Sequence, residues 1–307
     1  PMSRNTYHNH TVTSAVEFVA WIDSAVKAGL SVLDEEPLWF RGLSDHRFGL
    51  VPKALRKNNH QEGDARRAFE LFLRFKQQAV SRRDLPLGVK STVDWVLLAQ
   101  HHGLPTVLLD WTRNALTALW FATSQADAAE DYQRAHSNWR RCGRAGDEPP
   151  KPADSCVWAI DPSYLAANYV PDYKLFEFSD ALAEYAYRQT EIIPERYAGC
   201  PSHRQVPNET PEQWRKRVIA IPVHSPLVSP RIYSQHGRFT VHVDPAPLDE
   251  NIARYNTGAR CLIPCEHHRE IRLDLERLGV DLASLFNDLN SLAEYLDEIY
   301  RLGRVPG

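Results

Sequence analysis

The hydrophobic pattern of this 307-residue sequence changes period repeatedly, and this constrains the fold more than any other feature. Predicted helices, with apolar residues at helical spacing, cover 15–30, 64–82, 92–102, 114–128, 266–278 and 282–300. Predicted strands, short and apolar, cover 37–40, 156–160, 218–223, 239–243 and 260–263. Because these segments do not alternate regularly as in βαβ units, we expect an α+β fold in which long helices flank a mixed sheet of short strands.

The composition is that of an average globular protein. Lys and Arg number 36 against 39 Asp and Glu, so the net charge is −3, and 43% of the residues are hydrophobic. These values exclude a disordered chain, a collagen-like repeat and a highly basic nucleic-acid binder. The longest apolar runs, such as 93–99, are far shorter than the ~18 residues of a membrane span, and residues 1–10 contain no apolar stretch typical of a secretory signal. We therefore expect a cytoplasmic protein without membrane contact.

The cysteines do not form a disulfide framework, because they are odd in number and spread over positions 142, 156, 200, 261 and 265. One group resembles part of a zinc site: Cys261, Cys265, His267 and His268. Zinc usually takes two closely spaced pairs of ligands, and a second pair would have to come across space from Cys200 and His203. We expect free cysteines and no bound metal.

The first of three polar motifs is Trp39-Phe40-Arg41-Gly42, at the end of a predicted strand. Arginine presents a planar set of donors suited to a phosphate or a carboxylate, and glycine lets the backbone approach another group closely. The alternative is a core arginine paired with a buried carboxylate.

The second motif, 100–112, joins a helix end to a short strand and then to the next helix. Gln100 and His101 lie at the helix end, and Thr112 is placed to cap the following helix. The free N–H groups of that helix are also suited to a phosphate. Asp110 is a candidate general base or a counter-charge to Arg41; alternatively, it belongs with His101 to a buried network that fixes the turn.

The third motif, 231–240, is a polar loop that opens into an apolar strand. Gln235 would present a donor and an acceptor to whatever the loop faces, and Gly237 would serve a turn or bulge. The alternative is an ordinary hairpin loop.

Together these motifs resemble the FRG domain family, which is named for its aromatic-Arg-Gly motif and occurs mostly in bacterial and phage proteins. The matching segments are 40–42, 100–106, 108–112, 118–122, 235–240, 263–279 and 285–289. The resemblance covers about residues 14 to 300 and implies a single domain over 1–307. The polar, Pro- and Gly-rich segments at about 131–154 and 194–211 are predicted insertions and are not features of the family. Val107 departs from the family, which more often has arginine there.

The layout resembles the ADP-ribosyltransferases more distantly, and that resemblance implies a split sheet, NAD as a substrate and cleavage of its glycosidic bond to nicotinamide. The implied cofactor-binding residues are Arg41, Gly42, Gln100, Thr106 and Thr112. The implied catalytic residues are Asp110, His101 and Gln235. Such transferases have a glutamate in the third loop, where this chain has Gln235 and His236; Glu191 and Glu195 would serve only if the fold brings them in.

Two classes of function follow from the resemblance. The first is an NAD-consuming or ADP-ribosyl-transferring bacterial toxin, effector or antiphage-defence protein, with a protein or nucleic acid as the target of any modification. The second is a non-enzymatic module of such a system that recognises a nucleotide or a partner. A nuclease is disfavoured by the net charge of −3, and the arginines of 134–144 are expected on a solvated face.

Overall fold

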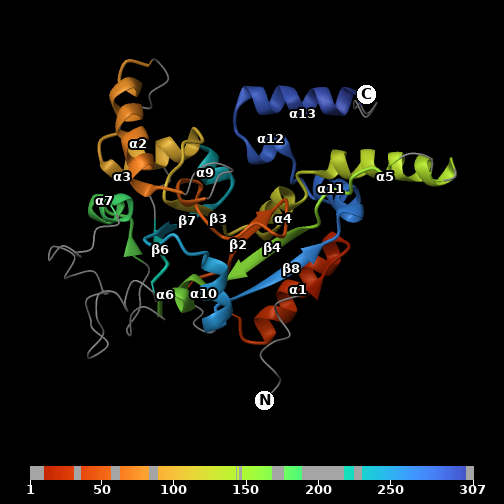
Figure 1. The fold of residues 1–307 in the computed structure, drawn as a ribbon, viewed down its shortest axis with the longest axis horizontal. Helices are drawn as coiled ribbons and strands as arrows, with labels where there is room; N and C mark the ends of the chain where they lie inside the picture. The colour runs from red at the N-terminus through yellow and green to blue at the C-terminus, as the bar shows by residue number, and fades with distance from the viewer. Residues whose placement is uncertain are drawn as a thin grey trace.

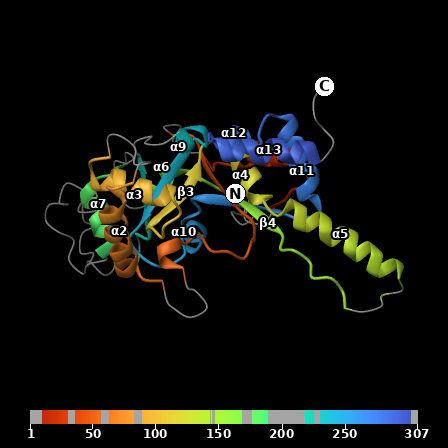
Figure 2. The same ribbon diagram turned by 90° about the horizontal axis from the view of Figure 1, so that it is seen from above.

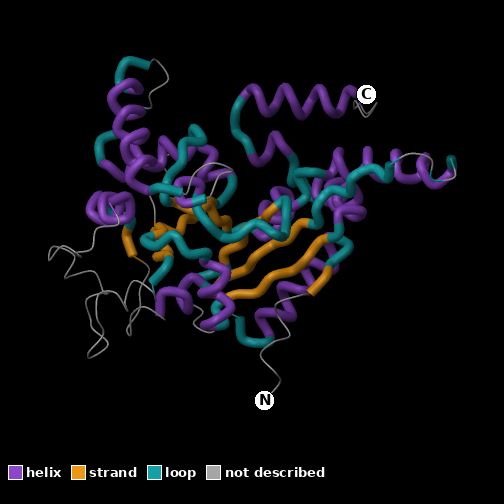
Figure 3. The backbone as a smooth tube through the Cα atoms, viewed as in Figure 1, coloured by secondary structure: helices purple, strands orange, loops and turns teal. Residues whose placement is uncertain are grey.

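The predicted α+β class is confirmed by the computed structural model, which describes residues 10–30, 36–56, 63–82, 89–142, 144, 147–167, 176–188, 218–224 and 230–301. Within these residues, one eight-stranded sheet is flanked by helices (Figures 1 and 3). The strands are β1 (His10–Thr11), β2 (Trp39–Leu43), β3 (Leu108–Thr112), β4 (Ser155–Ile160), β5 (Phe176–Glu177), β6 (Ala220–His224), β7 (Gly237–His242) and β8 (Gly258–Ile263).

The sheet is mixed and has a narrow junction at its centre. Its order is β1-β8-β4-β2-β3-β7-β6-β5, with β1–β8 and β5–β6 parallel and the other pairs antiparallel. β2 pairs with β4 over its whole length, and β3 pairs with β7 over its whole length. Between β2 and β3, only Phe40 and Thr112 are in register. The sheet therefore consists of two half-sheets that meet along one short edge.

The helices lie on both faces of this sheet. They are α1 (Ala15–Lys27), α2 (Ala65–Ala79), α3 (Thr92–His101), α4 (Ala115–Ala122), α5 (Ala126–Arg141), α6 (Pro162–Ala167), α7 (Asp180–Arg188), α9 (Pro230–Ser234), α10 (Leu248–Tyr255), α11 (His268–Arg277), α12 (Leu282–Leu285) and α13 (Leu289–Arg301). No helix of the described residues combines the length and the apolar character needed to cross a bilayer.

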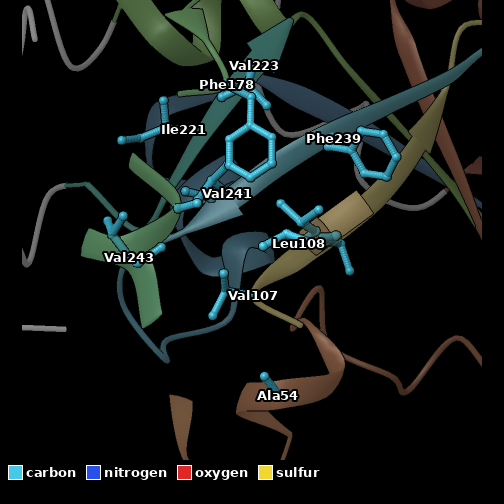
Figure 4. Packing of buried hydrophobic residues seen from close by; sticks show 14 of the residues in the cluster. Ala54, Val107, Leu108, Phe178, Ile221, Val223, Phe239, Val241 and Val243 are labelled. Carbon is cyan, nitrogen blue, oxygen red and sulfur yellow. The ribbon is translucent and has the colours of Figure 1, made fainter. Parts of the chain in front are cut away.

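Two hydrophobic cores hold the layers together. The first packs α1, α4 and α11 on the half-sheet of β2, β4 and β8, and includes Phe18, Leu119 and Ile271. The second lies under α2, α3 and α7, and continues between β3, β6 and β7, where Leu108, Phe239 and their neighbours interdigitate (Figure 4). Burial of these side chains gives both edges of the central junction a rigid support.

Gly42 in β2 determines how closely α4 approaches the junction. A Cβ atom at this position would lie 2.0 Å from the Ala118 carbonyl oxygen and 2.6 Å from the Ala122 backbone nitrogen. The glycine therefore lets the α4 backbone lie directly against the strand. The close approach predicted for this residue is thus made by a helix of the same chain.

Three helical segments differ from their predicted extents. The predicted helix 114–128 is two helices, because α4 ends at Ala122 and α5 starts at Ala126. The predicted polar insertion at 131–154 begins inside α5, which continues to Arg141 and projects from the body of the molecule (Figures 1 and 2). Buried Ala126 and Ala129 anchor its first turns, and this packing lets the helix continue into the polar residues that follow. The predicted helix 282–300 is broken, because α12 ends at Leu285 and its C-cap, Phe286, has an extended backbone. The second insertion, 194–211, lies outside the described residues.

Candidate functional site

A pocket of about 410 Å³ opens where the two half-sheets meet. All three sequence motifs contribute to its wall, with Arg41, Gly42, Gln100, His101, Asp110, Thr112 and Gln235. Its volume lies in the range of small-molecule sites, roughly 300–1,000 Å³. The junction brings these residues together because β2 pairs with β3, and β3 pairs with β7, which follows α9. Arg231 and Ile232 of α9 belong to the wall of the pocket.

Arg41 extends from β2 and is largely buried, with 16% of its side chain exposed. Its Nη1 donates a hydrogen bond to the backbone carbonyl of Asp110, while Nε is buried without a hydrogen-bond partner in the described structure. Burial lowers the pKa of Arg41, and nearby Arg56 lowers it further, whereas Asp110 acts in the opposite direction. A buried cation with so little compensation is typical of functional sites.

The carboxylate of Asp110 is 56% exposed, and its Oδ2 lies 3.8 Å from Arg41 Nη1. The alternative in which Arg41 pairs with a buried carboxylate is therefore wrong. Gln100 Nε2 donates to both carboxylate oxygens, at 3.0 and 2.9 Å. Asp110 is thus oriented by the end of α3 while its charge remains accessible from the pocket.

Thr106 holds the side chain of Gln100, which in turn binds Asp110. It is fully buried, accepts a hydrogen bond from the Leu108 N–H at 3.2 Å and donates its own to Gln100 Oε1. With Oε1 occupied in this way, the Gln100 amide must present its NH₂ group to Asp110. Thr106 does not line the pocket, so its predicted contact with a ribose is corrected to an orienting role.

Thr112 does not cap the helix that follows β3, contrary to the prediction. The cap is Asn114, whose Oδ1 accepts from the backbone N–H groups of Leu116 and Thr117 at 3.0 and 3.3 Å. The Thr112 hydroxyl accepts from the Asn114 N–H and donates to the carbonyl of Gln235 at 2.6 Å. It therefore ties the third motif to β3, at the one register position that joins the half-sheets.

The third motif is not a hairpin loop, because a short helix, α9, precedes the turn into β7. The left-handed residue of the turn is His236, with φ +49°, and Gly237 is the first residue of β7. Gly237 packs closely against α9, since a Cβ atom there would lie 3.1 Å from the Ile232 side chain. Gln235 Nε2 donates to the Leu285 carbonyl at 3.2 Å, as does Ser234 Oγ at 2.9 Å, so α12 holds this motif at the pocket.

His101 lies beside the pocket with its ring edge-on to His102, the ring centroids 5.0 Å apart. Partial burial lowers the pKa of His101, and the neighbouring His102 and Arg231 lower it further, against a weaker effect of Asp288. Its imidazole is therefore neutral at physiological pH and able to accept a proton.

Two arginines of the pocket wall were not assigned from the sequence. Arg231 on α9 stacks on Phe286, with its guanidinium carbon 4.5 Å from the ring centroid. Arg56 donates from Nε to the Val51 carbonyl at 2.9 Å. Together with Arg41, these arginines give the described part of the wall three positive charges against the one negative charge of Asp110, an excess of two. Arg231 opens the third motif, whereas Arg56 follows an extended segment that gave no signal.

Aromatic side chains complete the wall. Phe48 is 57% exposed, and Phe121 and buried Phe239 line the pocket with it. The site therefore combines anion-binding groups with flat apolar surfaces, as a nucleotide requires.

The cysteine and histidine residues near 265 do not assemble into a metal site in the described part of the chain. Cys261 is buried in β8, and His268 Nε2 lies 2.9 Å from Ser155 Oγ. Asp154, Cys265 and Glu266 do lie together, but Lys151 Nζ is 3.4 Å from both carboxylates and supplies the positive charge. Cys200, His203, Glu191 and Glu195 lie outside the described residues.

The fold is that of an α+β protein with a pocket where two half-sheets meet. Residues 36–131 match the family model of the FRG domain, and this segment includes Arg41, Gln100 and Asp110. Arg231 and Gln235 lie beyond the matched residues. No curated protein and no solved structure matches the chain.

Proposed function

We propose that the pocket binds NAD and cleaves its glycosidic bond to nicotinamide, for hydrolysis or for transfer of ADP-ribose. The observation that carries the proposal is the joint placement of Arg41 and Asp110, a buried guanidinium and an accessible carboxylate, at the junction of the half-sheets. The guanidinium suits the pyrophosphate, and the carboxylate suits the positive charge that develops on the ribose.

In the proposed reaction, the bond between the ribose C1′ and the nicotinamide nitrogen breaks, and its electron pair stays with nicotinamide. Asp110, held by Gln100, stabilises the oxocarbenium-like transition state, because a fixed charge is more effective in a pocket than in water. An oxygen nucleophile, from water or a target group, then bonds to C1′, and neutral His101 takes up its proton. Phe48 and Phe121 provide surfaces for the rings.

A second candidate function, recognition of a nucleotide without turnover, is supported by the third motif. Among the described residues that line the pocket, Asp110 is the one carboxylate, and Gln235 stands where ADP-ribosyltransferases have glutamate. Under this proposal Arg41 and Gln100 hold the ligand as a signal, and Asp110 fixes its orientation.

Mass spectrometry of NAD incubated with the purified protein separates the two candidates. Release of nicotinamide by the wild type and by Asp23→Asn, but not by Asp110→Asn, is expected for the enzyme; Asp23 is a matched surface control on α1, paired with Lys27. Intact NAD together with measurable binding would favour the recognition module.

The proposed biological role is a bacterial toxin, effector or antiphage-defence protein acting on the cytoplasmic NAD pool. Induced expression is then expected to lower cellular NAD and arrest growth, and Asp110→Asn is expected to abolish both effects. Growth arrest that persists in this variant with normal NAD would contradict the role.

A further inference from the structure

We infer that Arg56 and Arg231 make this pocket selective for ligands that carry two linked phosphates, so that dinucleotides and ADP-ribosyl compounds are preferred over mononucleotides. The inference deepens the proposed function and rests on the same pocket. It concerns two residues that neither the sequence motifs nor the family match assigned to the site.

Arg231 is held in place without an ion-pair partner among the described residues. Its guanidinium stacks on Phe286, which itself packs against Trp120 and Phe121 at centroid distances of 5.8 and 6.2 Å. Burial lowers the pKa of Arg231, and Asp110 and Asp288 only partly oppose this. Stacking fixes the plane of the guanidinium while leaving its edge donors free for an acceptor.

Arg56 approaches the same space from another element, the segment that follows the 3₁₀ turn Lys53–Leu55. Its Nε donates to the Val51 carbonyl, which fixes the side chain. Burial is the main cause of the lowered pKa of Arg41, and the positive charge of Arg56 adds a smaller effect in the same direction. Two cations brought together in this way are stabilised by an anion between them.

The charge of the wall indicates the ligand class. Among the described residues of the pocket wall, Arg41, Arg56 and Arg231 are balanced by the one carboxylate of Asp110, which leaves two positive charges. A phosphodiester-linked pyrophosphate carries one negative charge on each phosphate and offers acceptor oxygens in several directions. A single phosphate reaches fewer of the three guanidinium groups, which come from three separate elements.

Calorimetric titration of inorganic pyrophosphate and of inorganic phosphate into the full chain tests the inference. We expect pyrophosphate to bind at least tenfold more tightly than phosphate to the wild type. Arg56→Gln and Arg231→Gln should each reduce this preference by about tenfold, whereas Arg140→Gln, an equal change of charge on exposed α5, should leave it intact. If Arg231→Gln fails to fold, Arg231→Lys replaces it, because lysine keeps the charge but loses the stacked plane.

Equal affinities for the two anions in the wild type, or a preference unchanged in both pocket variants, would overturn the inference. Titrations with ADP-ribose, an organic diphosphate, and with AMP, an organic monophosphate, repeat the comparison of the two phosphate classes. Because these titrations need no turnover, a preserved diphosphate preference without nicotinamide release would refute only the proposed cleavage. Cleavage of NAD without that preference would refute only this inference.

Discussion

At the scale of single residues, Arg41 contacts Asp110 through the backbone carbonyl and only loosely through the carboxylate. The strand geometry of β3 therefore holds the arginine, and the Asp110 side chain is left for the pocket. The backbone of Asp110 supports the fold, whereas its carboxylate faces the pocket. A substitution of the Asp110 side chain therefore tests the proposed chemistry alone.

Asp110→Asn is accordingly expected to change the free energy of unfolding by less than about 1 kcal/mol, because the carboxylate is more than half exposed and its pair with Arg41 is solvent-screened. The same variant should lose nicotinamide release. Urea unfolding of both proteins provides the measurement. A loss of about 3–5 kcal/mol, as for a broken buried ion pair, would show that the residue is structural.

Residue types and spacing predicted much of the pocket, because Arg41, Gln100 and Gln235 each lie within three residues of a glycine, as is typical of site loops. Asp110 stood out as a polar residue within an apolar strand. The identity of the helix cap was not predictable, since Thr112 and Asn114 are both good caps and only the contact with Gln235 separates them. Arg56 was missed because its role depends on how an extended segment folds back toward β2.

At the scale of elements, local signals placed most helix starts correctly. Asp64 caps α2, and Ser91 with Asp94 forms a capping box at α3, so these starts are encoded within a few residues. The predicted strand ends also lie within a few residues of the observed ends, because turn residues flank each apolar run. The extension of α5 and the break between α12 and α13 depend on packing and were not predictable from propensity.

Gly42→Ala tests the contact between α4 and β2. Its methyl group would meet the Ala118 carbonyl at 2.0 Å, with backbone rather than a flexible side chain in the way. We expect the variant to lose about 1–3 kcal/mol of stability, or more if α4 cannot shift, because overpacking of a rigid contact is costly. Gly103→Ala is the control, because Gly103 has a positive φ but open space around the position of a Cβ atom. Thermal denaturation of the two variants therefore distinguishes overpacking from backbone strain. Equal losses in the two variants would contradict this explanation.

At the scale of the whole molecule, the buried face of β7 makes stability sensitive to acid. His242 is fully buried, and burial, with a smaller effect of Arg41, lowers its pKa to about 3. Its Nε2 lies 3.3 Å from Thr240 Oγ1, and Nδ1 has no partner in the described structure. The folded protein therefore resists protonation at this position.

The unfolded chain binds this proton near pH 6.5, so it holds more protons than the folded state between pH 6.5 and about 3. Stability should consequently fall as the pH drops below 6.5, by about 2 kcal/mol between pH 6.5 and 5 from this residue alone. Denaturant unfolding of the wild type and of His242→Gln at pH 7.5 and 5 measures the effect. The variant should show a smaller pH dependence, and an identical slope in both proteins would refute the assignment.

Titration calorimetry shows directly whether the junction of the two half-sheets forms a dinucleotide site anchored by Arg41. NAD and ADP-ribose are expected to bind the wild type, and Arg41→Lys should weaken binding by ~1.5–3 kcal/mol, because lysine keeps the charge but cannot make the bidentate contact. Absence of binding of either ligand to the wild type at millimolar concentration, or equal affinity in the lysine variant, would contradict the account.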